Sequence, residues 1–148
     1  MKKVAVASKR RMGPPGSPVW HSILDGAESI LQDDGYAKLT SRNIASRVGI
    51  KQQLVYYYFQ TMDDLVVTLF QRAAERDINK FSQAVASESP LRDIWEACSH
   101  MQDNKLVSEF TALSNRNAQL RKDVTSFIRK IRRMQLKAIN DALQEVGS

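Results

Sequence analysis

The sequence predicts an all-α protein in which a small N-terminal helical head is joined by a long helix to a larger helical body. Apolar residues recur at helical spacing along most of the 148-residue chain. No strand-like alternation bounded by turn residues, internal repeat or low-complexity segment stands out. A hydrophobic content of 43% is enough for one substantial core, or for two small cores that share a helix.

The composition favours an anionic partner in a reducing compartment. The net charge is +6 and the isoelectric point is near 9.6, so nucleic acid is the natural candidate. The single cysteine, Cys98, cannot form an internal disulfide, which fits the cytoplasm. No apolar run approaches the roughly 20 residues needed to cross a bilayer, so we expect no membrane span.

The first 17 residues read as a basic arm. Lys9, Arg10 and Arg11 precede the breaker run at 13–16, which contains two glycines and two prolines. Such an arm can enter a DNA minor groove beside a docked helix. A solvated terminus without a partner is an equally good interpretation.

Residues 18–64 are expected to form the head. Ser17 and Pro18 have the cap and first-turn chemistry of a helix start, and Thr40 can cap a second helix. Gly49 allows a sharp reversal before a third helix that begins near Gln52. The pattern is a helix-turn-helix, and Thr61 can cap the long fourth helix that follows it.

The third helix carries a predicted reading face. Advancing about 100° per residue places Val55 and Phe59 inside and Gln53 and Tyr57 outside. Amide and apolar groups on such a face suit base edges in a major groove. Residues 36–59 also contain four cations and no acid, which favours phosphate contact. The alternative is that the aromatic run 56–59 simply packs as a core.

Residues 65–148 are expected to form a helical regulatory and dimerisation domain. Three helical patterns follow Pro90, covering about 91–101, 106–113 and 124–143. Five apolar or soft side chains are candidates to line a ligand pocket, although such residues are more often ordinary core. They are Trp95, Cys98, Met101, Phe110 and Met134.

The head resembles the DNA-binding domain of the TetR family of bacterial transcription regulators. The similarity covers about residues 23–69. It rests on the spacing of Ala27, Gly35-Tyr36, Thr40, Ile44-Ala45, Gly49-Ile50, Tyr56, Phe59 and Leu65. The resemblance implies that Thr40 and Tyr56 hold phosphates. Lys51 departs from the small hydroxyl residue usual at its position, and Met62 replaces a usual phosphate-binding lysine. Because family members usually continue with two more long helices, we expect the body to be truncated in this chain.

The combined expectation is a homodimeric repressor that binds a near-palindromic operator in double-stranded DNA and is released by an unknown small-molecule effector. The predicted phosphate contacts are Thr40, Lys51, Tyr56 and Tyr58. The predicted base contacts are Gln52, Gln53, Leu54 and Tyr57. No cofactor or metal is expected, and an enzyme is disfavoured because no catalytic motif appears. The rival interpretations are a protein-interaction module and a DNA binder with little sequence preference.

Overall fold

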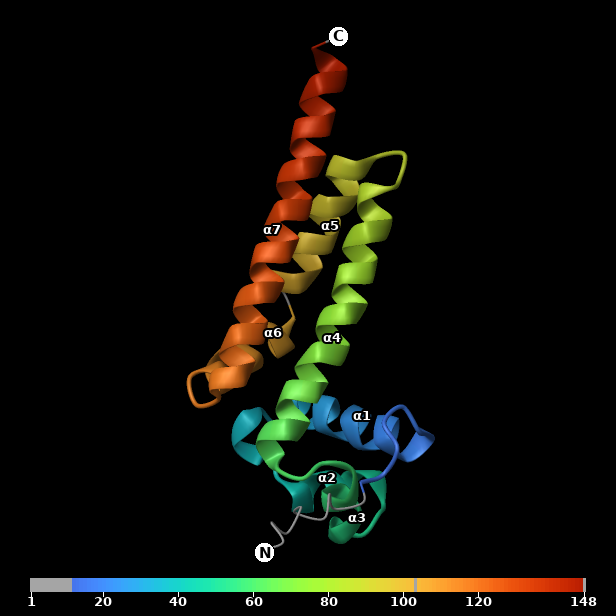
Figure 1. The fold of residues 1–148 in the computed structure, drawn as a ribbon, viewed down its shortest axis with the longest axis vertical. Helices are drawn as coiled ribbons and strands as arrows, with labels where there is room; N and C mark the ends of the chain where they lie inside the picture. Colours follow the sequence, from blue (N-terminus) through green and yellow to red (C-terminus); the bar gives the residue numbers. More distant parts are fainter. Residues whose placement is uncertain (1–11, 103, 148) are drawn as a thin grey trace, which may run out of the picture.

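The computed structural model describes residues 12–102 and 104–147, and every regular element in these residues is helical. The elements stack as a small head below an elongated helical body (Figure 1). Along the chain they are α1 (Pro18–Asp33), the 3₁₀ helix η1 (Tyr36–Lys38), α2 (Ser41–Val48), α3 (Gln52–Tyr58), α4 (Met62–Val85), α5 (Pro90–Gln102), α6 (Lys105–Ser114) and α7 (Ala118–Val146). The predicted all-α architecture is confirmed.

Local capping chemistry sets the helix boundaries in the head. The Ser17 side chain accepts a hydrogen bond from the Trp20 backbone N–H, and Thr40 accepts one from Asn43. At Gly49 the backbone is left-handed, with φ of +78°, which ends α2 and turns the chain toward α3. Thr61 caps α4, as expected from the sequence.

One apolar core joins the head to the lower body. Leu24 of α1, Ile44 of α2 and Val55 of α3 belong to the same buried cluster as Leu69 of α4 and Phe110 of α6. The cluster therefore crosses the expected domain boundary between residues 64 and 65. The two parts on either side of this boundary can have different functions, but they share one apolar core.

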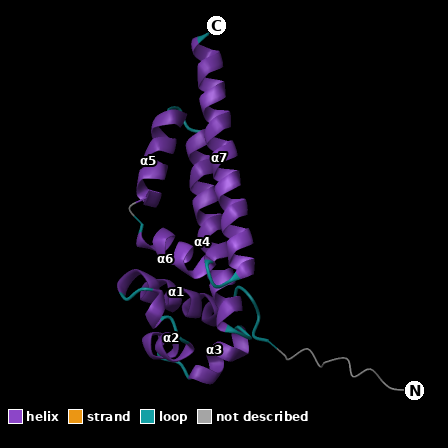
Figure 2. Cartoon of the chain, turned by 90° about the vertical axis from the view of Figure 1, so that its left-hand side faces the viewer, coloured by secondary structure: helices purple, strands orange, loops and turns teal. Residues whose placement is uncertain are grey.

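A second apolar cluster holds the upper body together. Phe81 of α4 packs with Ile94 of α5 and with Ile131 and Ala138 of α7. The fourth helix ends at Val85, just beyond this cluster's Ala84. Beyond this cluster the C-terminal end of α7 extends past α4 and α5 (Figures 1 and 2).

Polar contacts join α1 to α4 and η1 to α6. Arg72 of α4 forms an ion pair with Asp25 at 2.8 Å, and Glu28 lies against both Arg72 and Arg76. On the α6 side, Glu109 accepts a hydrogen bond of 2.7 Å from the Tyr36 backbone N–H of η1. Two body helices thus make direct polar contact with the head.

Candidate nucleic-acid interface and body cavities

The third helix has the inner and outer faces that its sequence predicts. Val55 and Phe59 are buried, with 1% and 4% of their surfaces exposed, while Gln53 and Tyr57 are exposed on the other side. Leu54 is half-buried at the edge of that outer face. The expected division of the aromatic run between core and surface is therefore correct in its main lines.

A hydrogen-bonded chain ties the start of α3 to the start of α2. Gln52 Nε2 donates to Ser41 Oγ at 2.8 Å, and Ser41 Oγ donates to the Tyr56 hydroxyl at 2.9 Å. The assignment of Gln52 to base readout stays a prediction, and its amide N–H₂ group in addition holds α3 to α2. Ser41 is buried and was missed in the sequence, because a serine after a capping threonine carries no signal of its cross-helix partner.

The Tyr58 side chain packs against other residues of the head. Its ring is half-buried against the first apolar cluster and meets the Tyr57 ring edge to face, with centroids 5.2 Å apart. The expectation that the Tyr58 hydroxyl holds a phosphate stays a prediction, and the ring in addition packs against the core. The periodicity missed this packing because the neighbouring N-terminal segment has no helical pattern.

Thr40 and Lys51 are both exposed at helix starts that face the same end of the head. Thr40 Oγ1 accepts from the Asn43 N–H at 3.1 Å, which leaves the hydroxyl proton to donate elsewhere. Lys51 occupies the cap position of α3 without a side-chain capping bond. Both geometries are compatible with donation to a phosphate oxygen.

Three of the four cations in residues 36–59 remain available to an anion. Arg47 is held by Asp33 of α1 and by Asp34, the residue that follows α1, at 2.8 Å each. Within residues 12–102 and 104–147, no carboxylate lies within ion-pair distance of the other three cations. These are Lys38, Arg42 and Lys51. The positive charge predicted for this region is therefore reduced by the pairing of Arg47, and the charges of the other three cations remain.

The predicted minor-groove contacts Lys9, Arg10 and Arg11 lie outside the described residues. The described segment that follows them, Met12–Gly16, reaches the last turn of α3 through Gly13.

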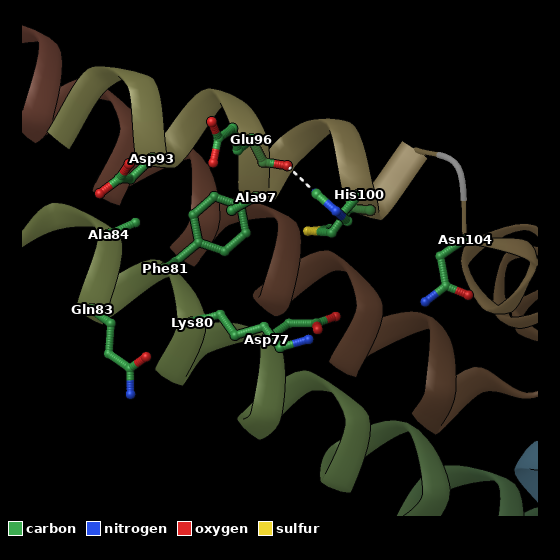
Figure 3. A pocket seen from close by; sticks show the side chains of 11 residues that line it. Asp77, Lys80, Phe81, Gln83, Ala84, Asp93, Glu96, Ala97, His100 and Asn104 are labelled. Carbon is green, nitrogen blue, oxygen red and sulfur yellow. Dashed lines mark hydrogen bonds between the residues drawn. The ribbon is translucent and has the colours of Figure 1, made fainter. Parts of the chain in front are cut away.

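The body contains a groove between α4 and α5 with a volume of about 450 Å³ (Figure 3). Charged side chains enter it from both helices, including Asp77 and Lys80 of α4 and Glu96 of α5. The imidazole Nδ1 of His100 lies 2.7 Å from the Glu96 carbonyl oxygen, within α5. This groove is more polar than the pocket expected from the sequence.

A smaller cavity of about 100 Å³ lies between α4, α6 and α7 and adjoins the groove through shared residues. Met101 and Phe110 line it, as two of the five predicted pocket residues. Cys98 and Met134 instead pack in the second apolar cluster. Trp95 is 73% exposed on α5, so its assignment to a pocket is wrong. Helical spacing did not reveal that α5 has only one covered face.

Asp77, which lines both cavities, has a perturbed carboxyl group. Burial raises the pKa of Asp77 above its ordinary value of 3.8, and the nearby Lys80 and Arg76 only partly oppose this shift. The ionised form is therefore less favourable in the folded protein than in the unfolded chain.

Replacing Asp77 with asparagine is expected to stabilise the protein at neutral pH. Because the folded-state pKa is raised, wild-type stability falls as the pH rises from 3.8 through the folded value, and the penalty is complete above it. The gain in Asp77→Asn should be small, since the carboxyl is partly solvated, and should shrink as the pH approaches about 4. Urea unfolding of both proteins at several pH values measures this. A gain that did not vary with pH would contradict a charge effect.

Two features of other functional classes are not found in the described residues. In the described part of the chain, no group of three or more His, Cys, Asp and Glu side chains is arranged to hold a metal ion. No described helix combines the length and apolar character needed to cross a membrane.

Taken together, α2 and α3 form a helix-turn-helix whose second helix has an exposed polar face flanked by cations, the arrangement of proteins that dock on DNA. Residues 23–69 match the family model described as bacterial regulatory proteins, tetR family. This part of the chain is therefore similar to the N-terminal region of that family.

Other proteins resemble this chain in sequence or in fold. The fatty acid metabolism regulator protein of Bacillus subtilis (strain 168) is 21% identical over 76 residues, or 51% of this chain and 39% of that protein. The chain therefore spans well under half the length of this relative. A TetR transcription regulator from Haloarcula marismortui ATCC 43049 has the same fold, with a TM-score of 0.73 and 21% identity over 84% of this chain and 70% of that one. The multidrug binding protein EbrR, complexed with imidazole, gives a TM-score of 0.61 at 21% identity, over 86% of this chain and 76% of that one.

Proposed function

We propose that this protein is a sequence-specific DNA-binding transcriptional regulator that a small molecule releases from its operator. The observation that carries the proposal is the exposed face of α3, where Gln53 and Tyr57 project from a helix-turn-helix bordered by unpaired cations. The match of residues 23–69 to the TetR family supports it.

The head would divide its contacts between phosphates and bases. Thr40 and Lys51 stand at helix starts and would position the head on the DNA backbone, together with the Tyr56 hydroxyl. Gln53 would pair with adenine N6 and N7, while Leu54 and Tyr57 would supply apolar contact to a thymine methyl group. Gln52 would support this face from within by holding α3 to α2.

The functional unit would be a homodimer that binds a near-palindrome in the cytoplasm. Two heads about 34–36 Å apart would enter successive major grooves, one at each half-site. In this division of labour residues 18–64 read DNA, and residues 65–148 carry the effector site and contribute to dimerisation. The shared core would transmit a change in one part directly to the other.

The effector would bind in the groove between α4 and α5, extended by the smaller cavity next to it. A volume of about 450 Å³ lies within the range of about 300–1,000 Å³ typical of small-molecule sites, whereas about 100 Å³ does not. The description of EbrR as a multidrug binding protein is consistent with an effector of this kind. Release requires that the effector bind more tightly to the conformation that cannot engage both half-sites.

Selection of bound duplexes from a random library tests the proposed function. We expect an enriched sequence with two inverted half-sites, and tighter binding to it than to a scrambled duplex at every salt concentration. Binding with a steep salt dependence but no enriched sequence would instead indicate a DNA binder without sequence preference. An absence of any binding would favour a protein-interaction module. No catalytic activity is part of the proposal.

A further inference from the structure

The 3₁₀ helix η1 of the head is held by a carboxylate from the body. Glu109 of α6 accepts, at Oε2, a hydrogen bond of 2.7 Å from the Tyr36 backbone N–H. This short distance is typical of a bond to a charged acceptor. Gly35, the residue before η1, has no side chain to cap it, so Glu109 supplies the acceptor that the local sequence lacks. A body residue therefore completes the start of a helix of the head.

The carboxylate also lies close to the backbone that precedes η1. Gly35 has φ of +84°, in the left-handed region that glycine adopts without strain. A Cβ atom added at this glycine would lie 3.4 Å from Oε1 of Glu109. The guanidinium carbon of Arg116, in the turn between α6 and α7, lies 6.0 Å from the centre of the Tyr36 ring. Two side chains of the body thus face η1.

The packing of α6 gives Glu109 a fixed position. Two residues close to it along the helix, Leu106 and Phe110, are buried with 4% and 5% of their surfaces exposed. Both belong to the core that the head shares with the lower body. Because such cores are densely packed and deform little, α6 is a firm support from which Glu109 can hold η1.

Hydrogen bonds continue from η1 to the start of α2. The Lys38 carbonyl oxygen, at the end of η1, accepts a bond of 2.8 Å from the Asn43 side-chain amide. The Asn43 backbone N–H in turn donates to Thr40 Oγ1 at 3.1 Å. Thr40 is exposed, and its hydroxyl proton is left to donate to a phosphate oxygen. A path of hydrogen bonds through one short helix therefore leads from Glu109 to a predicted phosphate contact.

We propose that Glu109 positions the DNA-contacting start of α2 from outside the head. By holding η1, it fixes Thr40 where the threonine hydroxyl meets the DNA backbone. Glu109 is a positioning residue and not a DNA contact, because a carboxylate repels a phosphate. This inference rests on the proposed DNA-binding function. It adds a determinant of DNA affinity in the body, outside the matched residues 23–69.

Two substitutions in the full-length protein test this role. Glu109→Ala removes the acceptor and should weaken DNA binding about fivefold, the effect of one ordinary hydrogen bond. The loss should be similar on the selected duplex and on a scrambled duplex, because phosphate contacts carry no sequence information. Glu109→Gln keeps an oxygen acceptor for the Tyr36 N–H and should stay within about twofold of the wild type. Equal losses in the two variants, or no loss in either, would overturn the proposal.

The sign of the change separates positioning from simple electrostatics. Removing a carboxylate lowers the repulsion between protein and DNA and by itself favours binding. Glu75→Ala is the matched control, since it removes the same charge from an exposed site on α4. This control should bind DNA as tightly as the wild type, or slightly more tightly. If Glu109→Ala gave the same result as Glu75→Ala, Glu109 would not position the head.

Coupling to Thr40 tests the path itself. Affinity is compared for the wild type, Glu109→Ala, Thr40→Ala and the double variant. Once the threonine hydroxyl is absent, Glu109→Ala should have little further effect on binding. An equal loss in both backgrounds would mean that Glu109 does not act through Thr40. Thermal unfolding establishes which variants are folded, and the comparison of Glu109→Gln with Glu109→Ala decides the matter if Thr40→Ala is not.

The wild type distinguishes failure of this inference from failure of the proposed function. A wild type that binds no duplex would remove both. A wild type that binds DNA, beside a folded Glu109→Ala variant that binds equally well, would remove only the role of Glu109. In that case the bond to Tyr36 would contribute to folding alone.

Discussion

Replacing Leu69 with alanine is expected to lower the free energy of unfolding by about 2–5 kcal/mol. Leu69 is fully buried on α4, in the cluster that includes residues of α1, α2 and α3 on one side and of α6 and α7 on the other. Removing its side chain leaves a cavity where head and body meet. Denaturant unfolding followed by circular dichroism measures the loss.

The number of unfolding transitions tests the shared core, just as the midpoint measures the loss of stability. Because one cluster serves both parts, the head and the lower body should unfold together in the wild type and in Leu69→Ala. Leu136→Ala is the matched control, since Leu136 is more than half exposed on α7 and its truncation should change stability by about 0.5 kcal/mol or less. A separate, earlier transition of the head alone would contradict the shared core.

Replacing Gln53 with alanine should weaken binding to the selected operator by about 1–3 kcal/mol, or roughly 5- to 150-fold, and should barely affect a scrambled duplex. Gln53 is exposed on α3, and its truncation does not disturb the core. Titrations of both duplexes with wild type and variant measure the difference. Equal losses on the two duplexes would show that Gln53 does not read bases.

Tyr56→Phe should instead weaken binding to both duplexes, if its hydroxyl holds a phosphate. The structure complicates this test, because the same hydroxyl accepts a hydrogen bond from the buried Ser41. Its loss is expected to cost about 1 kcal/mol of folding stability as well.

Ser41→Ala resolves the two contributions. It breaks the internal hydrogen bonds to Gln52 and Tyr56 but leaves the Tyr56 hydroxyl in place. Tyr56→Phe should therefore weaken DNA binding more than Ser41→Ala. Equal effects of the two substitutions would assign Tyr56 a purely internal role.

The sequence predicted the elements and most of the faces of the head. Capping residues and a glycine hinge are local signals, so Ser17, Thr40, Gly49 and Thr61 marked helix boundaries correctly. The burial of Val55 and Phe59 followed from helical phase alone, because α3 is short and has a single covered side. The same reasoning wrongly predicted that Trp95 lines a pocket. Helical periodicity shows which residues share a face of a helix, but it does not show whether another helix covers that face.

By itself, then, the sequence determined what depends on neighbours along the chain: the helix-turn-helix, its basic character and the outward direction of Gln53 and Tyr57. Tertiary structure alone decided what depends on contacts between distant segments. These contacts include the hydrogen bond from Gln52 to Ser41 and the packing of the Tyr58 ring against Gly13. They also include the ion pairs of Arg47 at the end of α1 and the single core that the head shares with the lower body. The physical reason is that capping and periodicity act over a few residues, whereas the partner of a side chain is set by how whole helices pack.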